Sequence, residues 1–264
     1  MNKMWSVVAL TSVFAVHAAD TPLVQTDFNA NFSRYFEKVA SDEMQGRAPA
    51  TEGEKRTVAY LETEFKRLGL TAYKDGSYRQ AVPVVQIDPV AVSSMTLTGD
   101  KTAANLVYKT DMMAWSTRMV PEIKLEDSEM VFAGYGIVAP EYNWNDYKDL
   151  DVKGKTVVVL VNDPGFATQD EKLFTGNAMT YYGRWTYKYE EAARQGAAML
   201  LIVHETEAAS YGWNVVSGTS PIRFELANAN KNMHKAQVEG WLSLDAAERL
   251  FAANGSSLKE MKAK

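Results

Sequence analysis

The side chains that most often carry out chemistry are scarce in this chain. Cysteine is absent, and only three histidines occur among the 264 residues, namely His17, His204 and His234. A hydrolase with two zinc ions needs several converging histidine and carboxylate ligands, and a further carboxylate to activate the bridging water. His17 lies in the apolar N-terminal stretch, and His204 follows an apolar run whose end it is expected to mark. The sequence therefore predicts no metal site and no catalytic residue in this chain.

Adjacent glutamates occur at one place, Glu190-Glu191. They lie in the segment Lys188–Gln195, which is expected to form a short helix ending at Gly196. Acidic pairs on a helix typically form a solvated face, and we expect the same here rather than a pair of metal ligands.

A glycine-rich turn at residues 134–139 matches a nucleotide-binding pattern. Its sequence, GYGIVA, fits G-x-G-x-x-A and follows an apolar strand. Pro140 and the loop through Asn145 stand where the phosphate-binding helix must begin, so we expect no dinucleotide site. No Gly-x-Ser-x-Gly elbow and no Walker-type loop occur in the sequence.

Two aromatic segments and one arginine remain as candidates for contact with a ligand. The segments Tyr181–Trp185 and Tyr211–Asn214 gather aromatic residues where the pattern does not indicate core. Two interpretations stay open: the rings pack the loops against the fold, or they line a cleft for a peptide. Arg47 can likewise form an ion pair within the fold or bind a substrate carboxylate. The candidate cleft contacts are Arg47, Tyr211 and Trp213.

Composition narrows the class of protein. The chain is 46% hydrophobic and 23% charged, which is ordinary for a globular protein of one large or two small domains. A net charge of −5 gives no electrostatic support for a nucleic-acid partner. Without cysteine, disulfides and thiolate zinc sites are excluded.

The N-terminus resembles a targeting segment. Lys3 is followed by the largely apolar stretch Trp5–Val16 and by small residues suited to cleavage after Ala18 or Ala19. This pattern predicts a signal peptide at residues 1–18 or 1–19 and a secreted or periplasmic protein. No other apolar run approaches membrane-spanning length, so no membrane span is expected after its removal.

Two helices are predicted after the signal peptide. Aromatic residues recur at helical spacing in Asp27–Ala40 and predict a stripe that packs on a core. In the second helix, Thr51 and Glu54 form a capping box, and an apolar face from Val58 to Leu68 is expected to be buried. The segment between them, residues 41–49, is too polar and broken for a helix.

The rest of the chain predicts strands, turns and short helices. An edge strand is expected at Tyr78–Ile87, because Pro83 cannot donate to a ladder. Continuous apolar runs at Thr156–Val161 and Ala198–Val203 predict strands covered on both faces, and with the helix between them they form a parallel βαβ unit. The remaining predicted elements are strands at Ser94–Thr98, Asn105–Thr110, Glu129–Ala133 and up to Trp241, a helix capped by Ser243 or Asp245, and a helix begun by the capping box Ser257 with Glu260.

Two long segments resemble one family in the same order. Residues 41–70, SDEMQGRAPATEGEKRTVAYLETEFKRLGL, are similar to the opening of the catalytic domain of secreted zinc aminopeptidases. Residues 131–166, VFAGYGIVAPEYNWNDYKDLDVKGKTVVVLVNDPGF, resemble the protease-associated (PA) domain inserted into such enzymes. The resemblance implies a mixed α/β chain with a signal peptide at 1–19, the N-terminal helices and edge strand of an incomplete zinc-exopeptidase domain at 20–88, and a β-rich PA domain with its return to the peptidase domain at 89–264.

That family holds zinc through a His-x-Asp motif, a Glu-Glu pair, a later Asp and a last His. The chain reads His204-Glu205-Thr206 and His234-Lys235-Ala236, so the motif is not present, and zinc is expected only in the full-length family. Two hypotheses follow. In one, the chain is the N-terminal fragment of an aminopeptidase that takes peptide substrates and lacks its C-terminal catalytic half. In the other, it is a non-enzymatic module whose PA domain binds a peptide or a protein.

Overall fold

A computed structural model describes residues 25–89, 94–98 and 103–262. The chain divides into two compact units, Met1–Ala81 and Val82–Lys264, called unit 1 and unit 2 below. Both helices and sheets are present, so the chain is mixed α/β, as predicted. The predicted signal peptide lies outside the described residues. Within those residues, no helix combines the length and the apolar character needed to cross a bilayer.

Unit 1 consists of two helices joined by a short turn segment. α1 spans Gln25–Ala40 and α2 spans Glu52–Arg67, and a 3-10 helix at Asp42–Arg47 lies between them. The expectation that residues 41–49 contain no helix is therefore wrong. The 3-10 segment is interrupted at Gln45 and Gly46, whose φ angles of 49° and 74° are not helical. The predicted cap of α2 is confirmed, because the Thr51 side chain accepts from the Glu54 amide.

The apolar faces of these helices are not covered. On α1, Phe28, Phe32 and Phe36 are stacked in a row with centroid separations of 6.2 and 6.1 Å, and they are 65%, 60% and 63% exposed. On α2, Leu61 and Phe65 are 39% and 37% exposed. The expectation that these stripes are buried on a core is thus wrong for the described residues of unit 1, 25–81, which contain no sheet that could cover them.

The predicted edge strand is shorter than expected and belongs to unit 2. β1 covers only Val84–Ile87 and pairs antiparallel with β10, Arg223–Leu226. The strand does not extend to Pro83, which has no N–H to donate. The Pro83 carbonyl still accepts from the Ala227 amide. Residues 82–88, which the sequence grouped with the N-terminal part, are therefore held by unit 2.

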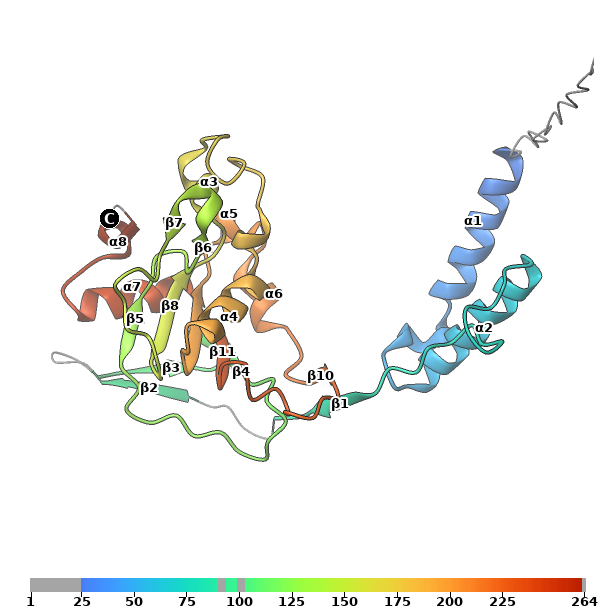
Figure 1. Cartoon of the computed structure of the whole chain (residues 1–264), viewed down its shortest axis with the longest axis horizontal. Helices are drawn as coiled ribbons and strands as arrows, with labels where there is room; N and C mark the ends of the chain where they lie inside the picture. The colour runs from blue at the N-terminus through green and yellow to red at the C-terminus, as the bar shows by residue number, and fades with distance from the viewer. Residues whose placement is uncertain (1–24, 90–93, 99–102, 263–264) are drawn as a thin grey trace, which may run out of the picture. The chain divides into compact units, whose positions relative to one another are not determined.

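Unit 2 is built around a five-stranded sheet in the order β4-β11-β9-β8-β5 (Figure 1). Its strands are β4 at Met112–Trp115, β5 at Met130–Phe132, β8 at Thr156–Leu160, β9 at Met199–Val203 and β11 at Val238–Leu242. β5, β8, β9 and β11 run parallel, and β4 pairs antiparallel with β11 at the edge. β8 and β9 are parallel neighbours with α4, Trp185–Arg194, between them in sequence, so the predicted βαβ unit is confirmed.

Helices and a hairpin cover the two faces of this sheet. One face packs against α4, α5 (Thr206–Ala209) and α6 (Trp213–Ser217), with Val157, Val159 and Leu200 in its core. The other face packs against α7 (Leu244–Ala253), α8 (Leu258–Lys262) and the hairpin of β2 (Ser94–Thr98) with β3 (Ala103–Val107). Every residue of β8 and β9 is buried, which explains their continuous apolar sequences.

The elements not yet described lie in the connections of unit 2. They are β6 at Val138–Ala139, a 3-10 helix at Pro140–Tyr142, β7 at Trp144–Asn145, α3 at Pro164–Thr168 and a 3-10 helix at Tyr181–Gly183. The predicted caps of α7 and α8 are confirmed. Ser243 accepts from the Ala246 amide, and Ser257 and Glu260 bond reciprocally as a capping box.

The strand predicted at Asn105–Thr110 is wrong at its C-terminal end. β3 ends at Val107, and the chain turns through Lys109, whose φ is 69°, before it enters β4. The amide of Asp111 bonds to the carbonyl of Val107 and closes this turn. The turn places β4 beside β11 and so brings Trp115 to the edge of the central sheet.

Candidate functional site

A cleft of about 940 Å³ opens at the β4–β11 edge of the sheet in unit 2. Glu239 of β11 lies opposite Trp115 of β4, and Trp241 lies opposite Met113. Because side chains alternate along a strand, Glu239, Trp241 and Trp115 share the face that forms the floor. α4 supplies Trp185, Thr186, Tyr189, Glu190, Ala193 and Arg194 to the lining, and the remaining lining residues are Thr117, Tyr211, Val215, Val216, Thr219, Arg223, Glu225, His234 and Lys235.

The aromatic part of the cleft is held in a fixed arrangement. The Tyr189 ring meets Trp115 edge to face at a centroid distance of 6.0 Å, and Trp185 at the same distance. The Tyr189 hydroxyl donates to the Gly240 carbonyl at 3.0 Å, which fixes α4 on β11. Rings positioned in this way offer apolar surface with little loss of conformational entropy when a ligand binds.

The floor of the cleft carries a buried carboxylate. Glu239 is 7% exposed, and its Oε2 accepts from the Trp115 indole N–H at 3.2 Å. Burial raises the pKa of Glu239, while Lys235 and the Trp115 indole oppose the shift. Arg223 lies over the Trp115 ring, with Cζ 4.3 Å from the centroid. Acidic and basic groups therefore flank the same indole.

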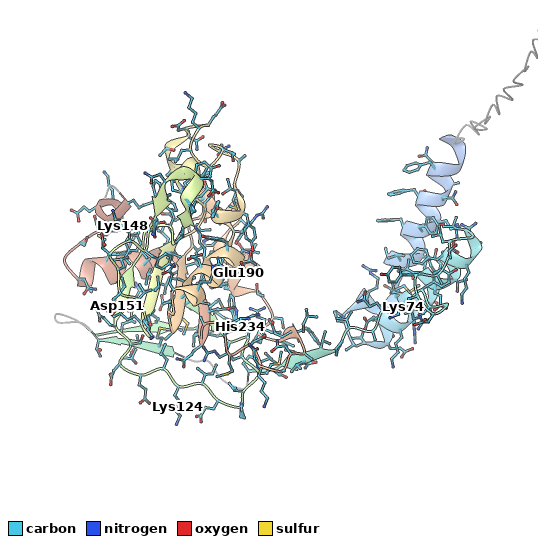
Figure 2. All side chains as sticks on the ribbon, viewed as in Figure 1. Lys74, Lys124, Lys148, Asp151, Glu190 and His234 are labelled. Atoms are coloured by element: carbon cyan, nitrogen blue, oxygen red, sulfur yellow. The ribbon has the colours of Figure 1, made fainter. Side chains whose placement is uncertain are left out.

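The adjacent glutamates behave differently from each other. Glu190 is exposed and lines the cleft, and Figure 2 labels it together with His234, another lining residue. Glu191 is buried and accepts from Arg194 and from Gln195 at 2.8 Å each. The prediction of a solvated face is therefore wrong for Glu191, because Arg194 folds back and satisfies its charge.

The three predicted contact residues are divided between the two units, with Arg47 in unit 1 and both Tyr211 and Trp213 in unit 2. Tyr211 lines the cleft. Trp213 packs beside it on the His204 ring and donates its indole N–H to the Lys109 carbonyl at 2.8 Å. Arg47 lies in unit 1, where it donates to the carbonyl of Val39. Their role in binding remains a prediction.

His204 directly follows β9, as the sequence predicts, and is enclosed by aromatic rings. It is 2% exposed, with Tyr211, Trp213 and Trp241 at centroid distances of 5.5, 5.6 and 5.9 Å. Burial lowers the pKa of His204, so its neutral form is favoured. Among the residues that the structure describes, no three His, Cys, Asp or Glu side chains gather closely enough to hold a metal ion.

The glycine-rich turn at residues 134–139 lacks the geometry of a phosphate cradle. The chain continues from it into β6 and the 3-10 helix at Pro140–Tyr142. The Ile137 amide donates to the Asp146 carboxylate at 3.0 Å, and a side chain at Gly134 would meet the same carboxylate at 2.8 Å. Asp146 therefore fills the position in which a dinucleotide phosphate would have to bind.

A fully buried lysine lies close to this turn. The Nζ of Lys188 donates to the carbonyls of Tyr135 and Asn162 at 2.5 and 2.8 Å. Burial lowers the pKa of Lys188 to about 7, and the charges of Asp146 and Asp163 oppose the shift. A neutral amine still has two N–H donors, which matches the two carbonyls that it serves. The geometry is that of a structural cross-link between the ends of β5 and β8.

Sequence reasoning missed the charged floor of the cleft. Glu239 lies in the strand sequence VEGWL, where a carboxylate beside a glycine in an otherwise apolar strand was the available signal. Trp115 and Arg223 come from two other segments, and only strand pairing brings them near Glu239.

No protein-family model matches the chain, and neither does any curated protein. Among solved structures, the chain is similar to an aminopeptidase from Aneurinibacillus sp. strain AM-1, with 17% identity and a TM-score of 0.34. The match covers 81% of this chain and 39% of the aminopeptidase, so the chain spans well under half of that structure's length. At this TM-score the similarity assigns neither a fold nor an activity to the chain.

Proposed function

We propose that the chain is the N-terminal part of a secreted or periplasmic zinc aminopeptidase with a PA domain, and that unit 2 binds peptide without hydrolysing it. The resemblance of residues 41–70 and 131–166 to that family supports the aminopeptidase assignment. Unit 1 supports it through the uncovered apolar faces of α1 and α2, which suit helices that pack against a sheet supplied by a further folded part.

The observation that carries the binding role is the aromatic cleft of unit 2. Its volume of about 940 Å³ is in the range of sites that take small ligands or a few residues of a peptide. The floor and walls are aromatic, with Trp115, Trp185, Tyr189, Tyr211 and Trp241 among the lining residues. A peptide can lay apolar side chains on these rings and direct its polar groups to the charged residues between them.

Zinc chemistry is not assigned to the described residues. The two histidines that they contain, His204 and His234, lie on different elements, and neither belongs to a cluster that could hold a metal. The residues present therefore do not fit a zinc centre, and we derive no hydrolytic step from them. The alternative, a non-enzymatic module, is favoured by one fact: every residue of the cleft comes from unit 2.

Calorimetric titration of the full chain with the blocked pentapeptide acetyl-Ala-Ala-Phe-Ala-Ala-amide tests the binding role. We expect a saturable signal, with affinity reduced about fivefold to tenfold in Trp185→Ala, because an aromatic contact contributes about 1 kcal/mol beyond its area. Trp185 is 46% exposed, so its removal should leave the fold intact.

The matched control is Tyr73→Ala, since Tyr73 is 97% exposed and lies in unit 1. The affinity of this variant for the pentapeptide should equal that of the wild type. Absence of a saturable signal, or an equal loss of affinity in both variants, would exclude the cleft as the peptide site.

A further inference from the structure

Most of the charged side chains that line the cleft have partners within the protein. Lys235 donates to Glu225 at 2.8 Å. Arg194 pairs with Glu191 at 2.8 Å, and its other contact, to Glu190, is longer at 3.9 Å. These groups already satisfy one another, so a ligand gains little by binding to them. Two lining residues of opposite charge are left, one acidic and one basic.

The acidic residue is Glu239. It is more than nine-tenths buried, and its only hydrogen bond in the described part of the chain is the one that Oε2 accepts from Trp115. Its other oxygen, Oε1, has no donor there, and no basic side chain forms an ion pair with it. A buried carboxylate with a free oxygen is costly unless a donor reaches it.

The basic residue is Arg223. Its guanidinium stacks on the Trp115 ring, with Cζ 4.3 Å from the centroid, and Nη1 donates to the Ser220 carbonyl at 3.2 Å. Its Nε is buried and has no acceptor within the described residues, and no acceptor is present for Nη2 either. Nη2 is therefore the donor that remains for a ligand carboxylate in the cleft. Trp115 thus contacts both a carboxylate and a guanidinium that form no ion pair within the described residues.

We propose that the cleft binds a zwitterion with an apolar side chain, that is, a free α-amino acid or a very short peptide with both termini free. The ammonium group would bind Oε1 of Glu239, the carboxylate would bind Arg223, and the side chain would lie on the rings of Trp185 and Tyr189. This inference rests on the proposed peptide-binding role of the cleft and specifies the ligand class.

Ligands with a single charge fit less well. A purely cationic ligand would serve Glu239 and leave the donors of Arg223 unsatisfied, and a purely anionic ligand would do the reverse. A zwitterion satisfies both residues and keeps the net charge of the cleft unchanged. Hydrolysis of an N-terminal peptide bond releases a molecule of this class, so a cleft of this kind would fill as product accumulates.

Four phenylalanine derivatives separate the contributions of the two termini in titrations of the full chain. They are phenylalanine, N-acetylphenylalanine, phenylalanine amide and N-acetylphenylalanine amide. We expect phenylalanine to bind most tightly, each singly blocked form about tenfold more weakly, and the doubly blocked form most weakly, because each loses a hydrogen bond between charged groups.

Two substitutions test which residue binds the ammonium group of the ligand and which binds its carboxylate. In Glu239→Gln, whose amide oxygen can still accept from Trp115, acetylation of the amine should no longer weaken binding. In Arg223→Gln, amidation of the ligand carboxylate should no longer weaken binding. Glu248→Gln and Lys259→Gln make the same charge changes at exposed positions of α7 and α8 and should retain the wild-type order.

The outcomes separate this inference from the proposed function. Equal binding of all four derivatives, or an unchanged order in both cleft variants, would overturn zwitterion recognition. If the blocked pentapeptide binds while phenylalanine does not, the peptide-binding role stands and this inference fails. If neither binds, both fail.

Discussion

Replacing Gly240 with alanine is expected to lower the free energy of unfolding of unit 2 by about 3 kcal/mol or more. Gly240 lies in the middle of β11, between the central strand β9 and the edge strand β4. A Cβ there would lie 2.4 Å from the Met113 carbonyl oxygen and 3.0 Å from Leu201. The Met113 carbonyl belongs to the backbone of β4, which pairs with β11. Neither strand can therefore move away without breaking the hydrogen bonds between them.

The same substitution should remove ligand binding, because Glu239 and Trp241 flank Gly240 and form the floor of the cleft. Thermal or urea unfolding followed by tryptophan fluorescence measures the loss of stability. Gly154→Ala is the control: its φ of 73° disfavours alanine, but a Cβ there meets nothing within 4 Å. We expect that variant to lose only about 1 kcal/mol. Equal losses would show that β11 tolerates a side chain at Gly240.

The stability that Lys188 contributes is expected to rise with pH between about 7 and 9.5. Burial lowers the pKa of Lys188 to about 7 in the folded protein, whereas an unfolded lysine has a pKa near 10.5. Between these two pKa values the unfolded chain keeps a proton on Lys188 that the folded chain must release. This release costs less free energy as the pH rises, so the folded state becomes more stable. The gain is roughly 3 kcal/mol, since each pKa unit corresponds to about 1.4 kcal/mol.

Comparison with Lys188→Met isolates this titration from those of other groups. We expect the difference in free energy of unfolding between wild type and variant to shift by roughly 3 kcal/mol in favour of the wild type between pH 7 and 9.5. Burial raises the pKa of Tyr135, which lies beside Lys188, to about 12, so that tyrosine does not titrate in the window. A constant difference across the window would mean that Lys188 stays charged in the folded state, with Asp146 and Asp163 as its counter-charges.

The buried strands and several caps were predictable because their signals are local. Thr156–Val161 and Ala198–Val203 are continuous apolar runs, and both form fully buried strands. Ser243 and Ser257 begin helices where a side-chain oxygen can accept from the first turn. Each of these signals lies within a few consecutive residues, and the packing of the folded chain agrees with it.

The cleft and the strand β4 were not predictable in the same way. Met112–Trp115 has no β-branched residue and no alternation, and it becomes a strand only by pairing with β11. Trp115 and Glu239 are 124 residues apart in sequence, yet they form one hydrogen bond. The apolar stripe on α1 shows the opposite case. The helix forms as predicted, yet among residues 25–81 no element covers its phenylalanines.

We propose above that unit 2 binds peptide without hydrolysing it. Zinc content by elemental analysis, measured with turnover of leucine and alanine p-nitroanilides on the same purified sample, tests it most directly. We expect no stoichiometric zinc and no turnover from a sample that still binds the blocked pentapeptide. About two zinc ions per chain, together with turnover that a chelator abolishes, would contradict the account. The ligands would then have to include His204 or His234.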